Sequence, residues 1–179
     1  MIKNSLLGFF GLRAIKESVV RSYDQYFWNY RRYLKMRGFG NHVNDWIFVK
    51  RGFLECWLEP GFHHFWRIWN PGIGYFTYRL YLTCGGKDRR EAATLAAFLV
   101  NGLFHNLVVS LMLWRWDFPL PFTFILFGAL TIMCRWLDKP IKMNKWPRIC
   151  HLAINIGLVL LGFDFGFFMD DLLHSFILP

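Results

Sequence analysis

The segment FWRIWNPGIGYFTYRLYLTCGGKDRREAATLAAFLVNGLFH, residues 65–105, holds two polar residues in very apolar surroundings. One of them, His105, lies near the middle of residues 95–114, a run of twenty residues without Lys, Arg, Asp or Glu. A helix of that length crosses a hydrocarbon core of ~30 Å. An ionisable side chain at that depth costs free energy, so it tends to face a partner, a cavity or a substrate path. His105 is therefore a candidate functional residue, and Asn101 lies one turn earlier on the same helical face.

Asn70 is the second polar residue of this segment. It ends an aromatic run that begins at Phe62, and Pro71 and Gly72 follow it directly. Proline disfavours the helical conformation in the residue before it, so Asn70 is predicted to mark a break between two helices. Broken backbone at membrane depth is tolerated only where it is buried in protein or lines a cavity. Both polar residues therefore indicate a site inside the protein.

At these residues the chain resembles the membrane-bound O-acyltransferase (MBOAT) superfamily. Members carry a histidine inside an apolar helix, preceded on an earlier helix by an FW-R-x-W-(Asn or His) segment; the corresponding segments here are FWRIWN and GLFHN. LYLTCGGKDRR is similar to the basic Gly-Gly stretch of bacterial members that acylate cell-envelope polymers, and LVLLGFDFGFF to the family's late apolar helix. The resemblance covers roughly residues 44–168. It is to the C-terminal catalytic half of bacterial cell-envelope polysaccharide O-acetylases.

The resemblance implies transfer of an acyl group, most simply acetyl, from a thioester donor to a hydroxyl of a cell-envelope glycan or lipid. Neutral imidazole suits removal of the hydroxyl proton, and an amide N–H suits stabilisation of the oxygen charge that forms on the acyl carbonyl. His105 is thus expected to be the general base, and Asn70 to orient the acceptor or polarise the thioester. Many bacterial polymer acylators carry histidine where Asn70 stands, so the resemblance does not define the substrate class. The predicted substrate-binding residues are Arg67, Trp66, Trp69 and Asn101.

The composition is typical of a mixed membrane protein. It is 55% hydrophobic and 20% aromatic with 18% charged residues, too apolar for an ordinary soluble domain and too charged for a chain that lies wholly in lipid. Apolar runs at residues 95–114, 118–136 and 149–168 predict about three transmembrane helices. The expected fold class is an all-α integral membrane protein, with further interfacial or re-entrant helices in a short MBOAT-like core.

Two regions are predicted, a basic aromatic interfacial segment at residues 1–43 and a membrane catalytic core at residues 44–179. Within the first, residues 6–20 are expected to form an amphipathic helix in the membrane interface. Residues 1–52 carry ten Lys or Arg against three acidic residues, and aromatic side chains are interleaved with arginines. This pattern is typical of an aromatic belt at the membrane surface, with an acyl-donor docking surface as the alternative. The aromatic residues are Tyr23, Tyr26, Phe27, Trp28, Tyr30 and Tyr33.

The formal net charge is +9, but the basic residues flank apolar runs and no nucleic-acid-binding module accompanies them. Nucleic acid is therefore excluded as a partner, whereas membrane lipids, the acyl donor and the hydroxyl acceptor are expected. The basic turn at residues 87–90 and the basic loop at residues 135–148 lie two spans apart, so both are predicted to be cytoplasmic. The expected location is the bacterial cytoplasmic membrane. A homo-oligomer or a partner membrane subunit remains open.

No bound cofactor and no metal site is expected, and acyl-CoA, with acetyl-CoA first, or an acyl-carrier thioester serves as co-substrate. His63 and His64 are adjacent, and their side chains leave a helix about 100° apart, which disfavours a shared metal ion. The four cysteines show no C-x-x-C spacing. Two alternatives stand beside catalysis: a non-catalytic or partner-dependent membrane subunit derived from an acyltransferase, and haem or metal binding by His105 and His151.

Overall fold

The computed structural model describes residues 29–40, 45–114 and 117–177, and the chain divides into two units, residues 1–43 and 44–179. In the first unit, residues 29–36 are helical and a turn follows, with Gly38 at a φ of 79°. The Tyr30 and Tyr33 rings stack at 6.4 Å, and the Arg37 guanidinium lies 5.0 Å from the centre of the Tyr33 ring. The amphipathic helix predicted at residues 6–20 and the aromatic residues before residue 29 lie outside the described residues.

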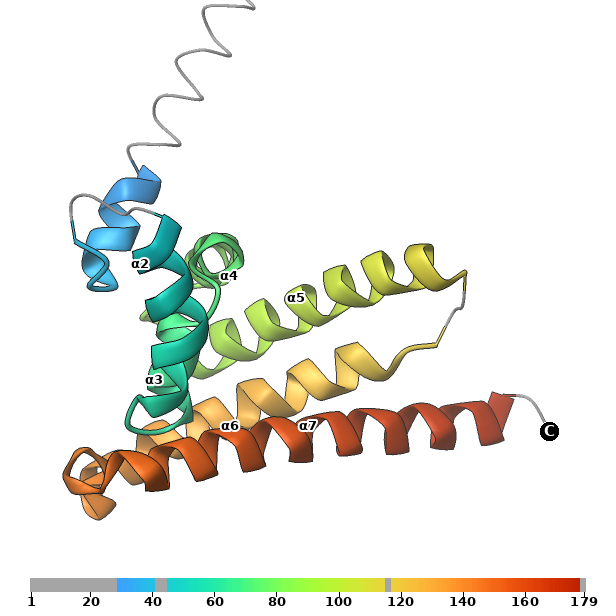
Figure 1. The fold of residues 1–179 in the computed structure, drawn as a ribbon. Coiled ribbons are helices and arrows are strands. Elements are labelled where there is room, and N and C mark those ends of the chain that lie inside the picture. Colours follow the sequence, from blue (N-terminus) through green and yellow to red (C-terminus); the bar gives the residue numbers. More distant parts are fainter. Residues whose placement is uncertain (1–28, 41–44, 115–116, 178–179) are drawn as a thin grey trace, which may run out of the picture. The chain divides into compact units, whose positions relative to one another are not determined.

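The second unit is helical throughout its described residues, which contain no strand. This confirms the predicted all-α fold class. In chain order its elements are α2 (Asp45–Val49), the π-helix η1 (Lys50–Leu54), the 3₁₀-helix η2 (Glu55–Leu58), α3 (Phe62–Ile68), α4 (Pro71–Thr83), α5 (Arg90–Leu113), α6 (Pro119–Ile141), the 3₁₀-helix η3 (Met143–Lys145) and α7 (Arg148–Ile177), as Figure 1 shows.

Three of these helices, α5, α6 and α7, are long and apolar enough to cross a membrane. They match the three predicted spans, and the chain is an integral membrane protein by this measure. Each helix is longer than the apolar run that predicted it, and α7 continues to Ile177 rather than ending at residue 168. The added turns contain Asp170, Asp171 and His174, which keep a helical backbone without being apolar. An apolar run indicates only the part of a helix that lipid can surround. The helix itself continues as far as its backbone hydrogen bonds do.

The long helices pack in the order α5, α6, α7, with α6 in contact with both neighbours. Glycines allow this close approach, as is common between transmembrane helices. A Cβ atom at Gly102 of α5 would lie 2.9 Å from the Leu120 carbonyl oxygen of α6. On α7, a Cβ atom at Gly166 would lie 2.6 Å from the Pro119 carbonyl oxygen. Glycines at the α5–α6 seam and the α6–α7 seam, the two lines of contact between these helices, therefore allow the three helices to pack closely in one layer.

Residues 45–58 are helical with a changing hydrogen-bond pattern, from α2 through η1 to η2. The last part of this segment is attached to α7 by Asn155, which is fully buried. The Asn155 amide nitrogen donates to the Trp57 carbonyl oxygen at 2.9 Å and to the Glu59 carbonyl oxygen at 3.1 Å. One side chain of a long helix thus satisfies the backbone at the end of η2.

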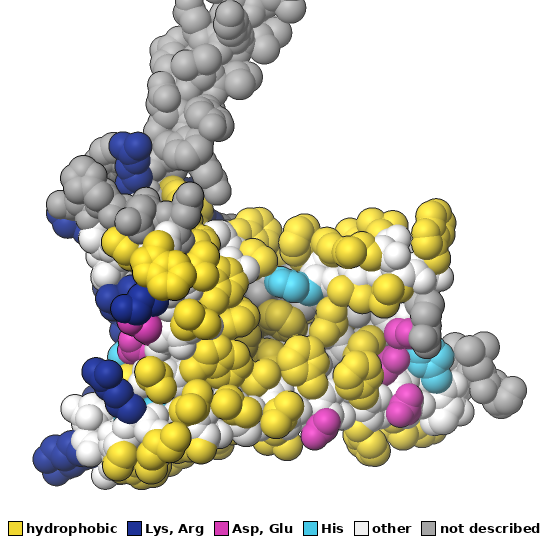
Figure 2. Space-filling view, viewed as in Figure 1, with side chains coloured by type: hydrophobic (Ala, Val, Ile, Leu, Met, Phe, Trp, Pro, Cys, Tyr) yellow, Lys and Arg dark blue, Asp and Glu magenta, His cyan; other side chains and the backbone are white. Residues whose placement is uncertain are grey.

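Charge is distributed unevenly over the second unit. Figure 2 shows hydrophobic side chains over most of the viewed face and Lys and Arg near one end, whereas Asp and Glu are seen both at that end and toward the other. Because α5, α6 and α7 alternate in direction, the α4–α5 turn and the α6–α7 loop lie at the same end (Figure 1). The two basic segments predicted to be cytoplasmic therefore share one side of the helical layer, as the positive-inside rule requires.

Candidate functional site

The helix break predicted at Asn70 is confirmed. α3 ends at Ile68, and Asn70 is the N-cap of α4 in the left-handed conformation, with φ 39° and ψ 74°. Its Oδ1 atom accepts a hydrogen bond from the Ile73 N–H at 3.4 Å, and its own N–H donates to the Gly52 carbonyl oxygen at 3.1 Å. Asn is one of few residues that tolerate this backbone and can also cap a helix. Because Oδ1 serves as the cap, the Nδ2 group is the part of Asn70 that remains for a ligand.

His105 is half-buried in α5, and its Nδ1 atom lies 2.8 Å from the Asn101 carbonyl oxygen. A carbonyl oxygen can only accept, so Nδ1 carries the proton and donates it. The neutral ring then has its lone pair on Nε2. The ring also stacks on Phe124 of α6, with 5.0 Å between centroids and 27° between planes. Asn101 and His105 lie on one helical face, as their spacing predicts, and the hydrogen bond between them uses the Asn101 backbone rather than its side chain.

Trp66 connects the FWRIWN segment to this histidine. Its ring lies 5.2 Å from that of Phe98 on α5 and 6.1 Å from that of Phe124 on α6. Phe124 is therefore in contact with both Trp66 and His105. On α5, Phe98, Asn101 and His105 follow one another at spacings of three and four residues, which places them on one helical face. The structure thus brings α3 and the His105 face of α5 together over α6.

Two polar atoms in this aromatic cluster are buried without a hydrogen-bond partner in the described part of the chain. They are Nε1 of Trp66, a donor, and Oδ1 of Asn101, an acceptor. Unpaired buried polar groups are costly and uncommon, and they often mark places where a ligand or water binds. Near His105 the protein therefore offers a base, a donor and an acceptor within apolar walls.

The other predicted site residues are placed differently. Arg67 is exposed on the last turn of α3. Trp69 packs against Phe53 at 5.4 Å and Trp57 at 5.6 Å, so its contacts are with η1 and η2. No hydrogen bond joins Asn70 to His105 within the described residues. Trp66 and His105 therefore share the contact with Phe124, whereas Trp69 packs against Phe53, Trp57 and Phe65.

Burial changes the pKa of several groups beside the break, outside the long helices. It raises the pKa of the Cys56 thiol to about 12, so this cysteine is not a nucleophile at neutral pH. Burial also raises the pKa of Glu59, against the opposing effect of Arg51 and Arg67. Burial first, and then the neighbouring His64, lower the pKa of His63 to about 4. The His63 imidazole is therefore neutral at pH 7.

Some polar residues serve the fold in ways that sequence patterns do not indicate. Arg135 of α6 pairs with Glu91 of α5 at 3.2 Å rather than with Asp164 of α7. Asp164 is exposed instead. The Asn106 amide nitrogen donates to the Asp117 carbonyl oxygen at 2.8 Å, which closes the end of the α5–α6 hairpin.

His151 lies in the first turn of α7, whereas His105 is fifteen residues (105 − 90) beyond the start of α5. The charges of His151 and Glu59 interact, which places His151 beside the end of η2. Two axial ligands of one haem must approach from opposite faces of a single iron. The different helical levels of His105 and His151 give no support to a shared haem.

Comparison with known proteins gives one distant relative. The chain is 29% identical over 110 residues to the Membrane-bound O-acyltransferase GUP1 of Saccharomyces cerevisiae, a match that covers 58% of this chain and 18% of the yeast protein. No family model matches the chain, and no solved structure matches it. The chain therefore spans less than a fifth of the yeast protein's length. This similarity, together with the three long apolar helices, supports a relationship to the membrane-bound O-acyltransferases.

Proposed function

We propose that this protein is a membrane O-acyltransferase that moves an acyl group, acetyl in the first instance, from a thioester donor to a hydroxyl of a cell-envelope glycan or lipid. The observation that carries the proposal is the state of His105: Nδ1 donates to the Asn101 carbonyl oxygen, which leaves Nε2 as a base in an apolar setting. The distant similarity to a yeast membrane-bound O-acyltransferase supports the same reaction class.

In this mechanism, Nε2 of His105 removes the proton of the acceptor hydroxyl as its oxygen attacks the thioester carbonyl. The C–O bond forms, the C–S bond breaks, and the imidazolium returns its proton to the leaving thiolate. The hydrogen bond to the Asn101 carbonyl oxygen stabilises the imidazolium that forms during the attack. General-base catalysis of this kind contributes about 10²–10⁴-fold to a rate.

Asn70 and Trp66 are assigned to binding in this proposal. The Asn70 Nδ2 group supplies a donor for the acyl carbonyl oxygen, because its Oδ1 atom already caps α4. Trp66 Nε1 and Asn101 Oδ1, both buried without partners, would hydrogen-bond to the acceptor. Arg67, exposed at the end of α3, would bind a phosphate or carboxylate of the acyl carrier. Acyl-CoA or an acyl-carrier thioester is the proposed co-substrate, in the bacterial cytoplasmic membrane.

The test is incorporation of labelled acetyl from acetyl-CoA, and of longer labelled acyl groups, into lipid and glycan fractions of membranes at matched protein levels. His105→Ala is expected to abolish incorporation, a loss of at least about 10²-fold. His174→Ala, which changes a histidine near the end of α7, is the matched control and should retain activity.

Asn70→Asp separates the catalytic role of Asn70 from its structural role. Aspartate keeps an oxygen that can cap α4 and tolerates the left-handed backbone, but it lacks the amide donor. We expect a loss of about 10²-fold or more in kcat with an unchanged melting temperature. Equal incorporation by wild type, His105→Ala and Asn70→Asp would contradict the proposal and favour a non-catalytic membrane subunit.

A further inference from the structure

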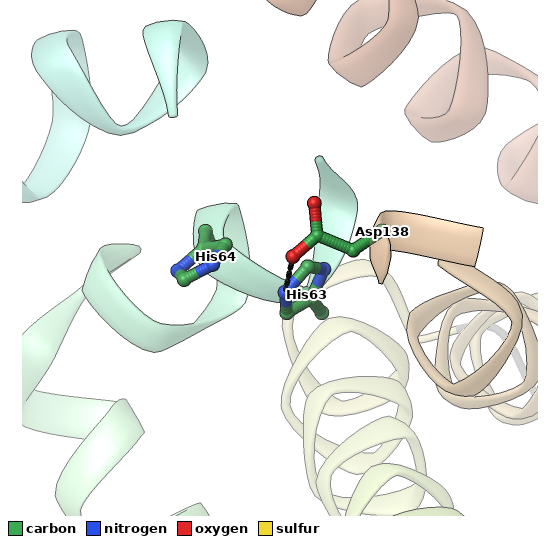
Figure 3. Close-up of side chains that lie close together, drawn as sticks. All are labelled: His63, His64 and Asp138. Atoms are coloured by element: carbon green, nitrogen blue, oxygen red, sulfur yellow. Dashed lines mark ion pairs between the residues drawn. The ribbon is translucent and has the colours of Figure 1, made fainter. Parts of the chain in front are cut away.

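A cluster of three side chains lies apart from the His105 cluster, between the start of α3 and the end of α6. His63 and His64 come from α3 and Asp138 from α6 (Figure 3). One ligand atom from each residue lies within 4.8 Å of the corresponding atoms of the other two. The two imidazole rings are 4.1 Å apart between centroids. The two rings are therefore close together, although the Cβ directions of adjacent helical residues differ by about 100°.

His63 and Asp138 approach each other without forming a hydrogen bond. Their Nε2 and Oδ2 atoms are 3.8 Å apart, too far for a hydrogen bond. The Nδ1 atom of His63 is buried and has no hydrogen-bond partner among the described residues. Neither ring nitrogen of a largely buried histidine is thus satisfied by the protein.

The spacing of these atoms fits a bound cation. Zinc binds histidine nitrogen and carboxylate oxygen at about 2.0–2.2 Å, so two ligands in a tetrahedral site are ~3.4 Å apart. The 3.8 Å between His63 and Asp138 is close to that value. His64 offers a ring nitrogen within 4.8 Å of the ligand atoms of the other two residues. Two imidazoles and one carboxylate suit zinc and similar divalent transition metals.

Charged groups of both signs lie around the three side chains. Arg135 is one turn from Asp138, but its guanidinium pairs with Glu91 at 3.2 Å. Arg67 is one turn from His63 and His64, and its charge acts on both histidines as well as on Glu59. The three side chains are partly exposed rather than sealed, so an ion can reach them from water.

We propose that His63, His64 and Asp138 bind one divalent transition-metal ion, zinc by preference, which joins α3 to α6. Three protein ligands leave the fourth tetrahedral position to water. The ion lies at the start of the helix that carries Trp66 and Arg67. Its consequence is structural: it holds this short helix against the end of α6.

The test uses the full chain, purified in detergent, treated with EDTA and then freed of the chelator. Isothermal titration with Zn²⁺ alone should show one equivalent bound per chain. His63→Gln, His64→Gln and Asp138→Asn should each weaken that binding at least about tenfold, since even indirect partners of a metal ligand commonly contribute that much. His174→Gln and Asp171→Asn, which change an unrelated histidine and an unrelated aspartate, should bind as the wild type does.

A second measurement covers the case in which a variant fails to fold. Co²⁺ added to the wild-type protein should produce the intense visible absorption of a tetrahedral nitrogen and oxygen site, and Zn²⁺ should remove it. The proposal is overturned if the wild type binds no Zn²⁺, if the Co²⁺ spectrum is that of the hydrated ion, or if folded variants of the three residues bind Zn²⁺ as tightly as the wild type.

Discussion

At the level of single residues, two adjacent aspartates of α7, Asp170 and Asp171, have different roles. Asp170 is buried, and its Oδ1 atom accepts a hydrogen bond from the Phe118 N–H at 2.7 Å, just before the first residue of α6. Asp171, the next residue, is exposed. A carboxylate at a helix N-terminus satisfies an unpaired N–H and interacts favourably with the helix dipole. Asp170 is therefore a cap for α6 supplied from α7.

This difference predicts unequal effects of the two aspartates on stability. Asp170→Ala should lower the free energy of unfolding by about 1–3 kcal/mol, because it removes a charged acceptor and leaves a donor unpaired. Asp171→Ala should change it by less than about 0.5 kcal/mol. Asp170→Asn, which keeps an acceptor, should be intermediate. Denaturation in detergent micelles measures all three, and equal effects of Asp170→Ala and Asp171→Ala would contradict the capping role.

At the level of elements, two glycines of α7 distinguish the seam with α6 from the opposite face. A Cβ atom at Gly166 would be 2.6 Å from the Pro119 carbonyl oxygen, whereas a Cβ atom at Gly157 would have nothing within 4 Å. Backbone cannot move as easily as the tip of a side chain, so the close approach at Gly166 cannot accept even a methyl group.

Alanine at these two positions should therefore act in opposite directions. Gly166→Ala should destabilise the protein by about 1–3 kcal/mol through overpacking. Gly157→Ala should stabilise it by about 0.5–1 kcal/mol, since glycine inside a helix carries an entropic disadvantage. Melting temperatures of the two variants in the same detergent compare them directly. Stabilisation by both substitutions would show that α6 and α7 are not closely packed at Gly166.

At the level of the whole second unit, the alternating directions of α5, α6 and α7 place its two basic connections on one side (Figure 1). Cys84 is exposed where α4 meets the first connection, and Ser175 is exposed near the end of α7, at the other end of the layer. An odd number of spans separates the two positions. They should therefore lie on opposite sides of the membrane, with Cys84 on the cytoplasmic side.

Labelling with a membrane-impermeant maleimide tests this topology in right-side-out and inverted membrane vesicles. In a Cys150→Ser background, Cys84 should react only in inverted vesicles. A cysteine introduced by Ser175→Cys, in a chain that also carries Cys84→Ser, should react only in right-side-out vesicles. Cys56 and Cys134 are buried and should stay unlabelled in both. Labelling of both positions from the same side would refute the three-span arrangement.

Local patterns are sufficient to predict the helices of this chain. A twenty-residue run without charges predicts α5, and Pro71 predicts the break at Asn70, because hydropathy and proline stereochemistry act within a few residues. The spacing of Asn101 and His105 likewise predicts that they share one helical face, since they are one turn apart. The proposed roles of His105 and Asn70 follow from the family resemblance and stay predictions.

Contacts between distant segments are decided only by packing. Phe124 lies between Trp66 and His105, and Asn155 binds the Trp57 carbonyl oxygen 98 residues away. The meeting of His63 with Asp138 and the pairing of Arg135 with Glu91 are of the same kind. Each helix has several faces of similar apolarity, so its own sequence does not specify which face meets which neighbour. That choice depends on the close approach at the glycine seams and on satisfying buried polar groups across helices, which are properties of the assembled fold.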